Sequence, residues 1–195
     1  MKLRLGILGS GKGSNFAAIA KAVRAGELEA ELCIVISDVQ DAGILRLAQE
    51  IGVPSHYIPP GRFRTKLEPE AEEQIVEILR GAMIDLVVLA GFMRVLKQTM
   101  LNAFPGRIIN IHPSLLPKFR GLEAWTQALN AREQITGCTV HLVDAGVDTG
   151  RVLGQRAVPI LPDDTSEILH ARIQMEEHRL LPAVIADLAR KWKTG

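Results

Sequence analysis

The sequence predicts a doubly wound α/β protein, in which a largely parallel β-sheet carries helices on both of its faces. Short apolar runs rich in β-branched residues alternate with stretches of helical periodicity over the first part of the chain. Several of these runs, such as residues 33–36 and 86–90, are apolar throughout, which is typical of parallel strands buried on both faces. Later runs are separated by loops instead of helices, so we expect the last strands to be antiparallel.

The strands are predicted from their apolar and β-branched content, and the turns between them from glycine and proline. In chain order, strands are expected at residues 3–8, 33–36, 55–58, 86–90, 108–111, 138–143 and 152–158. Residues 59–69, which are rich in proline and basic side chains, are expected to form a loop. The glycine-rich residues 144–150, DAGVDTG, are expected to form another loop after the sixth strand.

The helices are predicted from apolar residues that recur on one face. The glycine-rich residues 9–15 lead into the first helix, where Phe16, Ile19 and Val23 share a face. Further helices are expected at residues 42–51, 71–80, 98–104, 123–131 and 164–191.

The last of these helices carries two expectations of its own. Asp164 and Glu167 have the spacing of a capping box, which predicts that Asp164 caps the amino end. Pro182 lies inside the helical pattern, where the missing N–H group predicts a bend. We expect residues 1–195 to form one domain.

Composition narrows the class of protein. The 195 residues are 47% hydrophobic, and 23 basic residues nearly balance 22 acidic ones. This balance argues against binding of nucleic acid through phosphate neutralisation. No apolar stretch approaches the roughly 18 residues that span a membrane, and the amino terminus lacks the pattern of a signal peptide. The two cysteines, Cys33 and Cys138, lie in apolar runs without metal-site spacing, so we expect buried thiols in a cytoplasmic protein without a metal.

The segment GILGSGKGSN, residues 6–15, has three interpretations. It approaches a dinucleotide-binding fingerprint with Asp38 as the ribose-binding acid, but Ser14 stands where the third glycine belongs. It also approaches a Walker A loop, but Gly13 replaces the hydroxyl residue that binds magnesium. In the third interpretation, the backbone N–H groups of Gly13, Ser14 and Asn15 open a helix and hold a single phosphate. We favour the third, against both motifs and against a tight turn that binds nothing.

The segment RIINIHPSLLPKFRG, residues 107–121, places polar side chains where a strand ends. Asn110 and His112 are two residues apart, so both point to the same side of the strand. Asp144 and Asp148 lie in a later glycine-rich loop, and an aspartate that faces the histidine would raise its pKa. An amide and an imidazole together can stabilise an oxyanion. Since no serine stands in a nucleophile elbow, these residues indicate acyl transfer without a covalent intermediate.

Four segments together resemble the glycinamide ribonucleotide formyltransferases, a branch of the folate-dependent formyltransferases: GSGKGSN, AGFMRVL, NIHPSLLP and HLVDAGVDTG. The resemblance extends from about residue 5 to about residue 188. The Asn-x-His and Asp residues are shared by the wider group, whereas the GSN and AGFMR segments are more specific. The resemblance implies a Rossmann-like formyltransferase fold, with a largely parallel twisted sheet of about seven strands, helices on both faces and antiparallel last strands.

The resemblance also implies an activity. These enzymes move the formyl group of 10-formyltetrahydrofolate, a cosubstrate, to the amine of glycinamide ribonucleotide in purine synthesis, without a metal. Asn110, His112 and Asp148 match the catalytic residues of the family. We expect Asp148 to keep His112 charged, so that the imidazolium and the Asn110 amide stabilise the negative oxygen of the tetrahedral intermediate.

The ligand-binding residues are likewise implied by the resemblance. The residues matching the glycinamide ribonucleotide site are Gly13, Ser14, Asn15, Gln174, Met175, Glu176 and Glu177. The residues matching the folate site are Lys66, Met93, Arg94, Val95, Leu96, Asn110, Asp144, Ala145, Gly146, Val147 and Asp148. Lys66 stands where the family often has an arginine, which keeps the charge but loses the bidentate fork. Without the resemblance, Glu176 and Glu177 would be interpreted as a solvated helix face.

Some alternatives stay open. The segment GLEAWTQAL, residues 121–129, departs from the family, many of whose members carry histidines or an asparagine near Glu123 and Trp125. His141 is interpreted equally well as a packing residue or as support for the catalytic residues. The competing functions are hydrolysis of the formyl donor, formylation of another amine such as a sugar nucleotide, and a nucleotide-binding module without chemistry. The expected partners are small molecules, with neither nucleic acid nor membrane, and the sequence leaves a homodimer open.

Overall fold

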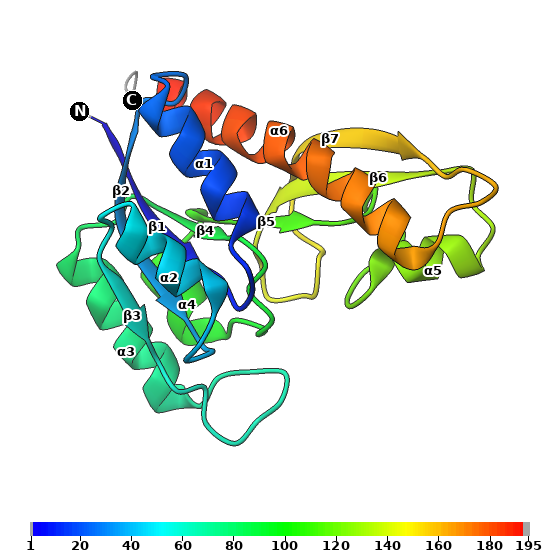
Figure 1. Cartoon of the computed structure of the whole chain (residues 1–195). Helices are drawn as coiled ribbons and strands as arrows, with labels where there is room; N and C mark the ends of the chain where they lie inside the picture. Colours follow the sequence, from blue (N-terminus) through cyan, green and yellow to red (C-terminus); the bar gives the residue numbers. More distant parts are fainter. Residues whose placement is uncertain (1, 193–195) are drawn as a thin grey trace.

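A seven-stranded sheet forms the centre of the computed structural model, which describes residues 2–192 (Figure 1). Its strands lie in the order β3-β2-β1-β4-β5-β6-β7. In chain order they are β1 (Leu3–Leu8), β2 (Ala30–Ser37), β3 (Ser55–Tyr57), β4 (Leu86–Leu89), β5 (Ile108–His112), β6 (Ile135–Leu142) and β7 (Val152–Pro159). The pairs among β1 to β5 are parallel, whereas β6 pairs antiparallel with both β5 and β7. The predicted fold class is therefore confirmed.

Helices cover both faces of this sheet. On one face lie α1 (Ser14–Arg24), α2 (Gly43–Glu50) and α6 (Ser166–Trp192), and on the other lie α3 (Pro69–Gly81) and α4 (Gln98–Ala103). The short helix α5 (Ala124–Asn130) packs against α6 near the β6–β7 end of the sheet (Figure 1). Because both faces are covered, β4 supplies Val88 to one apolar core and Val87 to the other. This double burial explains why its sequence is apolar at every position.

The start of α6 differs from the prediction. The helix begins at Ser166, and Thr165 caps it, since the Thr165 hydroxyl accepts a hydrogen bond of 3.3 Å from the N–H of Ile168. Asp164 is not the cap. Its carboxylate instead accepts from the N–H of Leu161 and pairs with Arg172 at 2.6 Å, which closes the turn before the helix.

Helix α6 lies close to β7 because a glycine faces it. A Cβ at Gly154 would lie 2.9 Å from Cγ2 of Val184 and 3.2 Å from Cδ1 of Leu180. The carboxyl-terminal half of the same helix lies beside α1 (Figure 1). Glu177, near the middle of α6, is therefore brought within reach of the first turn of α1.

The carboxyl ends of β1, β4 and β5 meet at one edge of the sheet, as expected for adjacent parallel strands. The loop after β1 is attached there to the loop after β4, because the N–H of Ser10 donates to the carbonyl oxygen of Gly91 at 3.0 Å. The loop after β6 starts at the amino end of β5, where the N–H of Val143 donates to the carbonyl oxygen of Ile108 at 2.9 Å, and it returns to the carboxyl end, where Asp148 lies beside His112. These loops therefore converge at one edge of the sheet.

Candidate active site

A cavity of about 420 Å³ opens where these loops meet. Its wall comes from the segments that follow β4 and β5 and from the loop that follows β6. The predicted site residues that line it are Met93, Arg94, Val95, Leu96, Asn110, His112, Asp144, Gly146, Val147 and Asp148. Lys66 and Ala145, also predicted as folate-binding residues, are not part of this wall. The cavity thus gathers most of the predicted donor site around the predicted catalytic residues.

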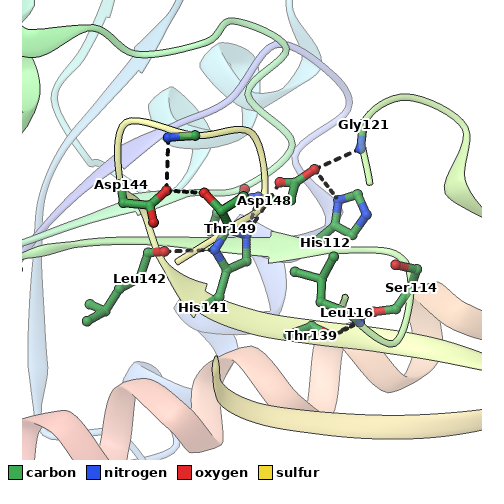
Figure 2. Close-up of polar contacts among 12 residues, drawn as sticks. His112, Ser114, Leu116, Gly121, Thr139, His141, Leu142, Asp144, Asp148 and Thr149 are labelled. Carbon is green, nitrogen blue, oxygen red and sulfur yellow. Dashed lines mark hydrogen bonds and ion pairs between the residues drawn. The ribbon is translucent and has the colours of Figure 1, made fainter. Parts of the chain in front are cut away.

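His112 is the last residue of β5, and only 4% of its surface is exposed. Its Nε2 lies 2.8 Å from the carbonyl oxygen of Phe119, and its Nδ1 lies 3.4 Å from Oδ2 of Asp148 (Figure 2). A carbonyl oxygen can only accept a hydrogen bond, so Nε2 carries a proton and donates it. Nδ1 is therefore the atom whose protonation decides the charge of the ring.

Burial lowers the pKa of His112, and this effect outweighs the opposite effects of the Asp148 carboxylate and the Phe119 carbonyl. The imidazole is consequently neutral at neutral pH in the ligand-free protein. The expectation that Asp148 keeps His112 charged is therefore wrong for the free site. The sequence placed the carboxylate correctly but could not show how far the ring is removed from water.

Asp148 connects the β6–β7 loop to the segment after β5. Its Oδ2 accepts a hydrogen bond of 2.8 Å from the N–H of Gly121, in addition to its contact with His112 (Figure 2). Burial alone would raise its pKa, but the contact with His141, the hydrogen bond from the N–H of Gly121 and the nearby His112 lower the pKa below its usual value. Asp148 is therefore an ionised carboxylate beside a neutral imidazole.

The two aspartates of this loop have different surroundings. Asp144 is exposed, and its Oδ1 accepts from the N–H of Gly146 at 3.1 Å and from the hydroxyl of Thr149 at 2.5 Å. These bonds hold the turn in shape and direct the carboxylate away from His112 (Figure 2). Of the two candidates, the structure brings Asp148 to the histidine and assigns Asp144 to the loop.

His141 supports the site from the neighbouring strand, an assignment that the sequence left open. It lies opposite Asn110 in the β5–β6 ladder, and its Nε2 lies 3.2 Å from Nδ2 of Asn110. Its Nδ1 donates to the carbonyl oxygen of Leu142 at 2.8 Å, which leaves Nε2 as an acceptor for the Asn110 amide. An amide nitrogen carries two hydrogens, so Asn110 retains one N–H for a ligand.

The backbone around the cavity is held in sparsely populated conformations. Among the described residues, Phe119, Glu123 and Asp148 have positive φ values of 55°, 51° and 52°. Residues other than glycine rarely adopt this backbone conformation, so the surrounding contacts must hold these three residues in it. Each of them touches the cavity or a residue that lines it, through the Phe119 carbonyl, the Glu123 backbone that starts α5, and the Asp148 carboxylate.

The glycine loop after β1 forms the start of α1, as predicted. Gly13 has a φ of 85°, and a Cβ there would lie 2.9 Å from Cα of Ile44, so both conformation and space require glycine. Ser14 and Asn15 form the first turn, where the N–H groups have no partner within the helix. This arrangement can hold an anion such as a phosphate.

Asn15 and Glu177 form a buried pair beside this turn. Nδ2 of Asn15 donates to Oε2 of Glu177 at 2.8 Å, and the two residues are 7% and 5% exposed. Burial raises the pKa of Glu177, although the hydrogen bond from Asn15 acts in the opposite direction. Oδ1 of Asn15 is buried without a partner among the described residues. The interpretation of Glu177 as a solvated helix residue is therefore wrong.

The other predicted acceptor residues on α6 are more exposed. Met175 is 58% exposed, and Glu176 forms ion pairs with Arg156 at 3.2 Å and Arg179 at 2.5 Å. Gln174 lies 3.4 Å from the ring nitrogen of His170. Of the four predicted residues, only Glu177 is brought into contact with the first turn of α1.

A second polar network holds the loops together beside the cavity. Asp38 is buried; its carboxylate accepts from the hydroxyl of Ser10 at 2.5 Å and pairs with Nε of Arg94 at 2.6 Å. Nη1 of Arg94 donates to the carbonyl oxygens of Phe63 and Arg64. Asp38 is thus occupied, which removes the ribose-binding acid that a dinucleotide site would need.

Lys66 belongs to the loop that Arg94 holds. It pairs with Val95 through a backbone bridge, but its ammonium lies over the ring of Phe63, 4.1 Å from the centroid.

Within residues 2–192, no helix is long and apolar enough to cross a bilayer. No cluster of three or more potential metal-ligating side chains occurs in the same part of the chain.

An ionised carboxylate, a neutral buried imidazole and an orientated amide around one cavity define a protein of the acyl-transfer class. Comparison with known proteins specifies the class further. Residues 3–185 match the sequence model of the formyl transferase family, and the chain belongs to this family.

Full-length relatives agree with this assignment. The phosphoribosylglycinamide formyltransferase of Bacillus subtilis is 38% identical over 185 residues, which cover 95% of this chain and 94% of the relative. A glycinamide ribonucleotide transformylase from Symbiobacterium toebii has a similar structure, with a TM-score of 0.93 and 44% identity over 97% of this chain and 89% of that one. The trifunctional purine biosynthetic protein adenosine-3 of Drosophila melanogaster is 44% identical over 95% of this chain, but the match spans only 14% of that longer protein.

Proposed function

We propose that this protein transfers the formyl group of 10-formyltetrahydrofolate to the amine of glycinamide ribonucleotide, giving formylglycinamide ribonucleotide and tetrahydrofolate in purine synthesis. The observation that carries the proposal is the meeting of Asn110, His112 and Asp148 at one cavity. The names of the full-length relatives support the choice of substrates. The anion-binding start of α1 supplies a place for the phosphate of the acceptor.

In this reaction the acceptor nitrogen bonds to the formyl carbon, and the bond from that carbon to the folate nitrogen breaks. One proton moves from the acceptor amine to the folate nitrogen. Neutral His112 takes up this proton, and because its ring nitrogens contact Asp148 at 3.4 Å and the Phe119 carbonyl oxygen at 2.8 Å in the ligand-free site, one of these contacts opens when the substrates bind. The ionised Asp148 stabilises the imidazolium that forms, and His112 then returns the proton to the leaving nitrogen.

The formyl oxygen becomes negative in the tetrahedral intermediate. The second N–H of Asn110 and the imidazolium of His112 stabilise this oxygen, and loss of one such donor typically lowers the rate by about 10²–10³. His141 fixes the Asn110 amide by accepting its first N–H. The amide is thus orientated before the charge develops, which is the condition for efficient electrostatic catalysis.

The acceptor site lies along α1 and α6. The phosphate binds the N–H groups of Gly13, Ser14 and Asn15, and Glu177 contacts the rest of the acceptor from α6. Oδ1 of Asn15, buried without a partner among residues 2–192, is an acceptor that a ligand donor can satisfy. The donor site is the cavity itself, with Met93 and Val147 among the apolar residues exposed at its wall.

The remaining properties follow from this activity. We propose that residues 1–195 act as one catalytic domain on small, soluble metabolites in the cytoplasm. The reaction needs no metal, because the formyl donor supplies the carbon unit in an activated form.

The proposal is tested by mixing the purified protein with glycinamide ribonucleotide and a stable 10-formylfolate analogue and following release of the deformylated folate. We expect turnover that depends on both substrates. Release without the acceptor would instead identify a hydrolase of the formyl donor. Turnover only with another amine, such as an amino sugar nucleotide, would change the acceptor. Nucleotide binding with neither reaction would indicate a binding module.

A further inference from the structure

Trp125 is one of the residues that line the cavity, and its ring is stacked against a histidine of α6. The rings of Trp125 and His170 stack with centroids 3.8 Å apart and planes inclined by 4°. Trp125 also packs against the apolar core beneath α6. An aromatic ring that lines a cavity and is already immobilised by a stacked neighbour can bind a planar ligand without loss of its own freedom.

The stack is one of the contacts that join α5 to α6. Another is a hydrogen bond of 2.8 Å between the hydroxyls of Thr126 and Ser166. Trp125 and Thr126 are neighbours on α5, whereas Ser166 and His170 lie about one turn apart on α6. The hydroxyl contact involves neither ring of the stack, so each contact can be removed by a variant without the other.

Helix α5 in turn holds the segment that positions the catalytic carboxylate. Nε2 of Gln127 donates to the carbonyl oxygens of Arg120 and Leu122, at 3.1 and 2.8 Å. Gly121, between them, donates its N–H to Asp148 at 2.8 Å. The support of Asp148 through Gln127 and Gly121 is separate from the Trp125–His170 stack, so an effect on the cavity wall can be distinguished from an effect on Asp148.

We infer that Trp125 is a specificity-determining residue for the planar part of the formyl donor, and that His170 is a positioning residue that holds Trp125 in place. This inference rests on the proposed function, because it assumes that the cavity binds the folate. Burial lowers the pKa of His170, so the stack joins two neutral rings at neutral pH. The stack needs no charge and should tolerate another flat ring in place of the imidazole.

The decisive variants are His170→Ala, which removes the support, and His170→Phe, which restores a flat ring. We expect His170→Ala to raise the KM for the formyl donor about three- to tenfold, the range typical of an aromatic pair. The KM for the acceptor and kcat should change less than twofold. His170→Phe should return the donor KM to within about twofold of the unmodified value. Ser166→Ala removes the hydroxyl contact and keeps the stack, so it is the matched control and should change the donor KM less than twofold.

A spectroscopic measurement tests the wall directly. The chain has two tryptophans, and Trp192 lies at the end of α6, so Trp192→Phe leaves Trp125 as the sole tryptophan. We expect the folate analogue to quench the Trp125 fluorescence, with a Kd that rises about three- to tenfold when His170→Ala is added. Quenching without turnover would refute the proposed function but retain the inference about the wall.

Three results would overturn the inference. The first is an unchanged donor KM in His170→Ala. The second is an equal loss in all kinetic constants that His170→Phe fails to rescue, since this would indicate a purely structural role. The third is Trp125 fluorescence that does not respond to the folate analogue.

Discussion

Replacement of Asp148 by asparagine isolates the charge of this carboxylate, because asparagine has nearly the same shape. Its amide oxygen can still accept from the N–H of Gly121, so the loop keeps its attachment. The imidazolium that forms on His112 during the reaction would lose its negative partner. The effect should therefore fall on the rate of the chemical step more than on folding or on substrate binding.

The expected magnitude follows from the distance between the two side chains. Opposite unit charges at 3.4 Å interact by about 5 kcal/mol when the effective dielectric constant is about 20. The Asp148 side chain is 11% exposed, so solvent weakens the interaction, and about 3–5 kcal/mol is a reasonable range. Each 1.36 kcal/mol corresponds to about tenfold in rate, which predicts a loss of about 10²–10⁴ in kcat.

The assay is release of deformylated folate at saturating concentrations of both substrates, measured from about pH 5.5 to 8.5. The pKa of His112 is already lowered, so activity should fall as the pH decreases below the usual histidine value and His112 becomes protonated. Loss of the Asp148 charge lowers this pKa further and should move the acid limb of the variant to lower pH. Asp85→Asn is the matched control, because Asp85 also accepts a backbone N–H, from Arg4 at 2.9 Å, but lies at the amino end of β4. A kcat within threefold of the unmodified value, or an acid limb at higher pH, would refute this account of Asp148.

Three further predictions concern catalysis, acceptor binding and folding. His112→Ala should lower kcat by about 10²–10⁴, because it removes both the proton carrier and an oxyanion donor; a thermal melt checks that the variant is folded, and near-normal turnover would exclude the assigned role. Glu177→Gln should raise the acceptor KM about tenfold or more. Because the folded pKa of Glu177 is raised, its ionisation destabilises the fold as the pH rises above about 4.5. Glu177→Gln should therefore raise the Tm, relative to the unmodified protein, by more at pH 8 than at pH 5. Glu176→Gln should show no such difference. Gly137→Ala should destabilise the protein by about 2–4 kcal/mol, because the new Cβ would lie 2.0 Å from the carbonyl oxygen of Arg156 in β7. Gly81→Ala is the control, since a Cβ there would have no atom within 4 Å. Equal chemical denaturation curves for the two variants would contradict the clash.

The fold was predictable because its determinants are local and repeated. An apolar run buried on both faces has a distinctive composition, and the missing helix between β6 and β7 indicated the antiparallel end of the sheet. Element ends were less predictable, as the cap of α6 illustrates. Asp164 and Thr165 are both good caps, and the choice between them depends on Arg172, which pairs with Asp164 from about two turns further along the chain.

The identity of the site residues was partly predictable, but their partners were not. Asn110 and His112 follow from the two-residue period of a strand that ends in a loop. Arg94 was expected at the folate, yet its guanidinium holds the loop of residues 59–69 and pairs with Asp38. His141 had one recoverable signal, since an antiparallel strand next to β5 must place some residue opposite Asn110. Which residue stands there depends on the register of β5 and β6, and this register is not written in either strand alone.

The protonation states of the site are the property that sequence reasoning handled least well, and they decide the chemistry. A histidine, an aspartate and a glutamate are visible in the sequence, but their pKa values depend on burial by elements that are far apart in the chain. His112 is neutral because it is buried, and Asp148 is ionised because the N–H of Gly121 donates to it and His141 and His112 lie close by. A neutral base beside an ionised carboxylate can accept a proton and stabilise the cation that results, whereas an imidazolium in the free enzyme could only donate. The direction of the first proton transfer is therefore set by the packing of the loops around β5, and not by the presence of the three residues alone.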